Sequence, residues 1–180
     1  LTNFIMKLIF PMYFYSLITP PNKDELISEA KECELDENQI FHWGKECVIK
    51  QERLNREKIL PFLIPSYMQF QRNFQEIFKK NFDVEILEAW RNTYFKGYFQ
   101  EIHDHMSADL SAVLFLNNKV AGSGEFFFYN RHQTELGAKW AFDVAPNLSK
   151  NIKPNYSKGD ILFFPSYMLH GVTPHNIDET

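Results

Sequence analysis

Apolar positions change their spacing about halfway along the chain. In 65–82, "PSYMQFQRNFQEIFKKNF", they recur at near-helical intervals, and Pro65 suits the first turn of a helix. In 21–33, "PNKDELISEAKEC", acidic side chains fill the first turn before a short apolar stripe. We therefore predict helices over 21–33 and 65–82. The stripe predicted to face the core in the second helix is Met68, Phe70, Phe74, Ile77 and Phe78.

The segment between these helices carries weaker signals. Residues 50–59, "KQERLNREKI", are polar and of helix-forming type, so they predict a short helix. Residues 34–48 are predicted to be loop with one short strand.

From residue 83 the pattern becomes typical of strands. Aromatic and alternating runs, separated by turn signals such as "NNK" and "GSG", predict strands over 83–95, 110–117, 124–130, 138–146 and 160–166. Helices followed by a run of antiparallel strands indicate an α+β fold, either a β-sandwich or a small open barrel backed by helices.

The N-terminal stretch 5–18 is apolar enough to suggest a signal peptide or a membrane segment. Lys7 and Pro11 interrupt its apolar run before it reaches the roughly 20 residues that a spanning helix needs, and no small-residue cleavage site follows. We predict a bent edge strand instead. The chain of 180 residues is then expected to be one domain over 1–180, with helical support mostly in 21–82 and a β-barrel core in 83–180 plus the edge strand.

Charge and cysteine content narrow the classes of partner. A net charge of −4 does not provide the broad basic surface that nonspecific nucleic-acid binding needs. Two cysteines, Cys33 and Cys47, are too few for a disulfide framework and indicate a reduced, cytoplasmic protein. The expected partner is a small-molecule or side-chain substrate, with no membrane partner, and a homodimer is the candidate assembly.

Three histidines carry the candidate chemistry. His103 and His105 are two residues apart, so on an extended strand their imidazoles share one face. The pair occurs as Gly97-x5-His-x-His, and a second segment reads Gly159-x5-Pro-x4-His, ending at His170. If the two segments lie on neighbouring barrel strands, three imidazoles meet at one metal ion and leave open positions for substrate and dioxygen.

Four segments carry a resemblance to a known family: "AWRNTYFKGYFQEIHDH", "LSAVLFL", "SGEFFFYN" and "KGDILFFPSYMLHGV". In order and spacing they resemble a small family of iron(II)- and 2-oxoglutarate-dependent oxygenases. The resemblance implies a double-stranded β-helix, a jelly-roll or cupin-like barrel backed by the N-terminal helices. It also implies Fe(II) as cofactor, 2-oxoglutarate as cosubstrate, and hydroxylation of a substrate that the sequence does not identify.

The same resemblance implies roles for single residues. His103 is the first metal ligand and His170 the distal one. The family usually places a carboxylate at position 105, where this chain has His105, so a third imidazole is expected to complete the site. Asp104 and Asp109 are the alternative carboxylate ligands.

Cosubstrate contacts are implied in the same way. Tyr94 is expected to give 2-oxoglutarate a hydroxyl contact. Family members pair the far carboxylate with an arginine about ten residues after the distal histidine, a position that here falls at Thr180. Arg131 is the candidate substitute.

Two other functions stay open on the sequence. In a cupin-type dioxygenase or isomerase that does not use 2-oxoglutarate, Asp109 would join the three histidines as a ligand. In a non-catalytic binding domain, the barrel would be kept and the metal lost. The remaining histidines, His42, His132 and His175, are predicted to be surface residues.

Overall fold

The computed structural model describes residues 13–35, 49–131 and 151–178. Two helices lie in this part of the chain, α1 (Lys23–Glu32) and α2 (Arg56–Phe78). The strands are β1 (Ser16–Ile18), β2 (Lys50–Arg53), β3 (Trp90–Thr93), β4 (Gln100–His103), β5 (Leu110–Leu114), β6 (Phe126–Tyr129), β7 (Asn151–Ile152), β8 (Ile161–Pro165) and β9 (His170–Val172). Every strand pairing among them is antiparallel. The predicted combination of helices with antiparallel sheets, an α+β fold, is therefore confirmed.

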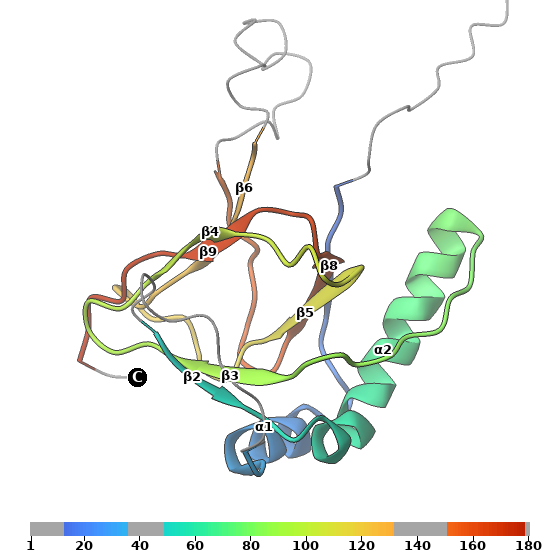
Figure 1. Ribbon diagram of the computed structural model, residues 1–180, viewed down its shortest axis with the longest axis horizontal. Coiled ribbons are helices and arrows are strands. Elements are labelled where there is room, and N and C mark those ends of the chain that lie inside the picture. Colours follow the sequence, from blue (N-terminus) through green and yellow to red (C-terminus); the bar gives the residue numbers. More distant parts are fainter. Residues whose placement is uncertain (1–12, 36–48, 132–150, 179–180) are drawn as a thin grey trace, which may run out of the picture.

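The strands form three groups that surround the centre of the molecule in Figure 1. One sheet has the order β1-β8-β5, a second has the order β4-β9-β6-β7, and β2 and β3 form a separate pair. In the figure, β4 and β9 lie at the top, β2 and β3 at the bottom, and the helices along the lower and right sides. The predicted N-terminal edge strand is confirmed for β1, which pairs with β8 at the edge of its sheet; residues 5–12 lie outside the described part.

Helix α2 is longer than predicted and begins nine residues earlier than 65. The side chain of Asn55 accepts hydrogen bonds from the backbone N–H groups of Glu57 and Lys58, which caps the helix N-terminus. Pro61 and Pro65 both lie inside the helix, where each removes a backbone N–H donor, and the helix continues past both. The cap therefore sets the start of the helix, and Pro65 does not.

Packing of α2 on the β1-β8-β5 sheet builds the main core. Phe70 is fully buried and stacks on Phe163 of β8, with ring centroids 4.7 Å apart. Two members of the predicted core stripe, Met68 and Ile77, are exposed. The stripe prediction is thus correct for the phenylalanine face and wrong for these two residues.

Several predicted strand boundaries need correction. Residues 50–53 form β2, not the start of a helix, because they pair along their whole length with β3. The strand predicted over 83–95 is confined to β3, the strand expected at His103 is β4 and ends at that residue, and β7 and β9 were not predicted as strands. The predicted strand over 138–146 lies outside the described residues.

Neither described helix has both the length and the apolar character needed to cross a membrane.

Candidate metal centre

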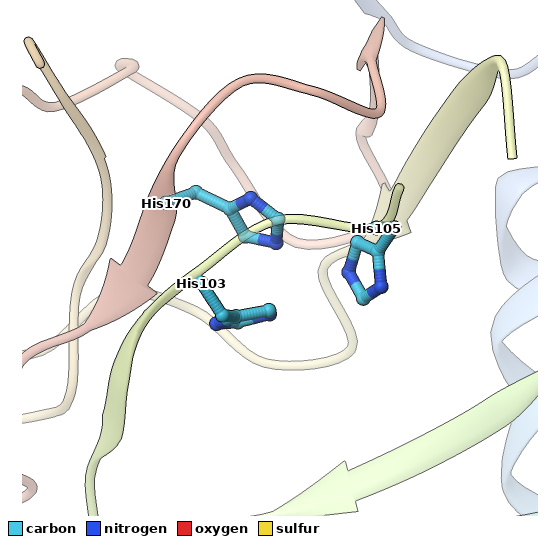
Figure 2. Close-up of side chains that lie close together, drawn as sticks. All are labelled: His103, His105 and His170. Carbon is cyan, nitrogen blue, oxygen red and sulfur yellow. The ribbon is translucent and has the colours of Figure 1, made fainter. Parts of the chain in front are cut away.

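Antiparallel pairing of β4 with β9 brings the first two histidines together. His103 ends β4 and His170 begins β9, and the two residues are register partners. Their ring centroids are 4.2 Å apart. The ring of His105 lies 5.0 Å from each of the other two. Figure 2 shows the three imidazoles turned toward one another, and one nitrogen of each lies within 4.8 Å of the others.

His105 reaches this cluster from a turn, not from a strand. Strand β4 ends at His103, so the expectation that both side chains share a strand face does not apply. Instead the backbone N–H of His105 donates to the carbonyl of Ser166, 2.9 Å away, just beyond the end of β8. This bond fixes the turn against β8 and directs the third imidazole to the centre.

Two backbone carbonyls determine which ring nitrogen faces the centre. Nδ1 of His103 lies 2.8 Å from the carbonyl oxygen of Glu101, and Nδ1 of His170 lies 2.8 Å from that of Met168. A carbonyl can only accept, so each Nδ1 carries the proton and donates. The Nε2 of each ring is then unprotonated, as in histidines that bind metals; that of His103 lies 3.4 Å from the amide nitrogen of Gln100, a contact that a bound metal ion would replace.

Burial keeps the three imidazoles neutral. It lowers the pKa of His170, which is 4% exposed, to about 3, and lowers the pKa of His105 to about 4. Burial also lowers the pKa of His103. Each imidazolium would in addition repel its neighbours. At neutral pH the cluster therefore presents three uncharged nitrogen donors, the form that binds a metal ion.

The alternative carboxylate ligands are not part of the cluster. Within the described residues, the group able to hold a metal ion consists of the three histidines alone. Asp104 is half-buried, and its charge raises the pKa of both His103 and His105, which opposes the effect of burial. Asp109 is exposed, and its backbone carbonyl accepts from Ser166.

A hydrogen-bonded chain connects the predicted cosubstrate residue to the metal centre. The hydroxyl of Tyr94 donates to Oε1 of Gln100 over 2.7 Å, and the amide nitrogen of Gln100 lies 3.4 Å from Nε2 of His103. Burial raises the pKa of Tyr94, so its hydroxyl stays protonated. Sequence reasoning missed Gln100, although its position three residues before a candidate ligand was visible. Arg131 lies exposed in the turn after β6.

His175 was predicted to be a surface residue and is buried. Its Nδ1 accepts from the backbone N–H of Gly124, and its own backbone bonds to Gly97 and Tyr98. These contacts join the end of the chain segment after β9 to the turn before β4. His42 and His132 lie outside the described residues.

An open hollow of about 630 Å³ lies apart from the histidines. It is lined by the 119–125 loop, Lys153 and the segment after β9, and contains none of the predicted site residues. Glu125 in its wall forms ion pairs with Lys119 and Lys153.

The family described as "Putative 2OG-Fe(II) oxygenase" matches residues 88–180, just over half of the chain and all three histidines. The chain belongs to this oxygenase family.

Two solved structures have a similar fold. An oxidoreductase of the 2OG-Fe(II) oxygenase family from Burkholderia pseudomallei is 14% identical, with a TM-score of 0.59 over 91% of this chain and 79% of that one. A prolyl-4-hydroxylase from Pseudomonas putida is 17% identical, with a TM-score of 0.55 over 91% of this chain and 87% of that one. No curated protein sequence matches the chain closely.

Membership of the oxygenase family confirms the predicted function class. The protein is an oxidoreductase that uses Fe(II) and 2-oxoglutarate. The donor set of the cluster fits such a metal, because imidazole is a suitable ligand for iron and three ligands on one side leave coordination positions open.

Proposed function

We propose that His103, His105 and His170 bind the catalytic Fe(II) of this 2-oxoglutarate-dependent oxygenase. The observation that supports the proposal is the convergence of three buried, neutral imidazoles within 4.8 Å of one another. Two of them are oriented by backbone carbonyls, which reduces the rotational freedom lost on metal binding. Asp104 then acts outside the ligand set, where its charge partly offsets that of the metal.

The third imidazole changes the charge of the site. Two histidines and a carboxylate would leave a divalent ion with one positive charge, whereas three neutral imidazoles leave two. A dianionic oxo acid is therefore favoured electrostatically at this centre, and metal binding alone is weaker than at a carboxylate-containing site. We accordingly expect metal and 2-oxoglutarate to bind with positive coupling, each strengthening the other.

The surrounding side chains position the centre and keep water away from it. Phe126 and Phe164 pack against the ring of His170, with centroid separations of 5.5 and 4.9 Å. Trp90 covers His105 from the other side, at 5.4 Å. When bound, Fe(II) with 2-oxoglutarate and dioxygen supplies the oxidising power that replaces a C–H bond of the substrate by C–OH. The protein's own part is to fix the imidazoles and to exclude solvent.

Tyr94 is proposed to belong to the cosubstrate pocket, because its protonated hydroxyl is connected through Gln100 to His103. Arg131 is the second sequence candidate for a cosubstrate contact, and its substitution by Gln tests that role directly. A Tyr94→Phe variant is expected to weaken 2-oxoglutarate binding, while leaving zinc binding within about twofold because the imidazoles are unchanged.

We further propose that the two larger sheets are the two halves of a double-stranded β-helix. The order β4-β9-β6-β7 and the order β1-β8-β5 both place strands side by side that are distant in sequence, which supports a jelly-roll arrangement.

The test of this function is anaerobic titration of the Fe(II)-loaded protein with 2-oxoglutarate. We expect a weak metal-to-ligand charge-transfer band in the visible spectrum. His103→Ala and His170→Ala variants should lose the band, and Asp109→Asn should keep it. Iron binding without the band would instead support a cupin-type site, and absence of iron binding even with 2-oxoglutarate present would rule out both.

A further inference from the structure

One face of the β2–β3 pair looks toward the histidines. Arg53 and Trp90 are register partners on the two strands, so their side chains share a face. The guanidinium carbon of Arg53 lies 5.4 Å from the centroid of the Trp90 ring, and that ring lies 5.4 Å from the ring of His105. Trp90 thus lies close to both a cation and a candidate metal ligand. In Figure 2, His105 points toward the pale green strand, which is β3.

The opposite face of the pair has a structural role. Arg91 forms an ion pair with Glu52 across the strands and donates to the carbonyl oxygens of Ala30 and Lys31 in α1. Those contacts attach the strand pair to the helix. Arg53 is therefore the arginine of this pair that faces the metal centre.

The guanidinium of Arg53 already forms an ion pair with a carboxylate of the protein. Nη1 of Arg53 lies 2.7 Å from Oε2 of Glu88. The Arg53 side chain is only 16% exposed, whereas that of Glu88 is 52% exposed. Such an exposed partner contributes little to stability and can be displaced at low cost. A guanidinium has five N–H donors in a planar fork that matches a carboxylate, and the guanidinium carbon of Arg53 lies over the Trp90 ring.

We propose that Arg53 and Trp90 form a carboxylate-binding subsite beside His105, in which Glu88 takes the place of a ligand carboxylate. The ligand is an organic acid whose other end reaches the metal centre. This inference rests on the proposed function for the identity of that centre. The carboxylate belongs either to 2-oxoglutarate itself or to the second substrate, and the experiment separates these sources.

The indole N–H signal of Trp90 in ¹⁵N NMR spectra is the reporter, assigned with a Trp90→Phe variant. Zinc-loaded and metal-free protein are titrated with 2-oxoglutarate, with 2-oxobutyrate, which lacks the far carboxylate, and with succinate. We expect the signal to shift with a dicarboxylate and Arg53→Gln to weaken that binding about tenfold or more. Glu88→Gln should strengthen it severalfold, because the competing carboxylate is gone. Arg72→Gln, which removes an exposed charge on α2, should change nothing.

The titrations with the different acids and variants distinguish the two sources of the carboxylate. Loss of 2-oxoglutarate affinity in Arg53→Gln, with 2-oxobutyrate unaffected, assigns the subsite to the cosubstrate. In the other case, Arg53→Gln leaves the 2-oxoglutarate affinity unchanged, but succinate binding to the 2-oxoglutarate-saturated protein depends on Arg53. That result assigns the subsite to an acidic second substrate. The proposal is overturned if no probe depends on Arg53, if Arg131→Gln causes the loss instead, or if Glu88→Gln weakens binding as Arg53→Gln does. Arg53-dependent succinate binding in a protein that fails to bind zinc would leave the subsite standing and refute the metal centre.

Discussion

Acidification is expected to destabilise the metal-free protein through His170. Burial lowers the pKa of this residue to about 3, whereas an unfolded chain gives histidine a pKa of about 6.5. Above pH 6.5 both states are neutral, and the residue adds no pH dependence. Between about pH 6.5 and 3 the unfolded state binds a proton that the folded state does not, so stability falls as the pH falls.

The magnitude follows from the proton uptake alone. At pH 5 the unfolded histidine is almost fully protonated and the folded one is not, so His170 lowers the free energy of unfolding by about 2 kcal/mol relative to pH 7.5. The residue is 4% exposed, so solvent screening removes little of this effect. A loss of about 2 kcal/mol is a substantial part of the 5–15 kcal/mol that stabilises a typical domain.

Urea unfolding of the metal-free protein at about pH 7.5, 6 and 5 measures this dependence. The matched variant is His170→Asn, whose amide can still donate to the carbonyl of Met168 but does not titrate. Below pH 6 we expect the free energy of unfolding of the variant to fall less steeply than that of the unmodified protein. The slopes should differ by about 1.4 kcal/mol per pH unit, which corresponds to the uptake of one proton. Equal slopes in the two proteins would show that His170 is not buried as a neutral imidazole.

Three further changes test the packing around the site. Phe70→Ala removes the ring that stacks on Phe163 and should lower the free energy of unfolding, measured with urea, by about 3–5 kcal/mol. Met68→Ala, on the exposed side of the same helix, should lower it by under about 0.5 kcal/mol. Similar losses in the two variants would contradict the packing described for α2. Gly171→Ala places a Cβ 2.9 Å from the carbonyl oxygen of Gln100, so β4 must move away from β9. Because this movement separates His103 from His170, the zinc affinity measured by calorimetry should fall. Gly124→Ala is the control, which should destabilise the fold without lowering the zinc affinity. Asn55→Ala removes the cap of α2 and should lower the free energy of unfolding by about 1 kcal/mol, and no loss would mean that the cap does not define the helix start.

The parts of the fold that could be predicted are those with strong local periodicity. The segment 21–33 contains α1, and the apolar runs over 110–117 and 160–166 contain β5 and β8. Strand β2 could not be predicted, because "KQER" is polar and becomes a strand through its pairing with β3. Strands β4 and β9 are only four and three residues long, too short to show a period.

The histidine cluster was predictable because two spaced motifs placed its members at the ends of neighbouring strands. The route by which His105 enters was not, because it depends on a turn held by the carbonyl of Ser166. Arg53 and Trp90 were missed for a related reason. Their position beside His105 comes from the register of β2 with β3, which no local pattern in the sequence specifies.

X-ray absorption of the anaerobic Fe(II)-loaded protein tests the central claim most directly, because it counts the imidazoles bound to iron. We predict three imidazole ligands, with one fewer in His105→Ala and no change in Asp109→Asn. Two imidazoles in the unmodified protein, with a carboxylate lost in Asp104→Asn or Asp109→Asn, would contradict the three-histidine centre.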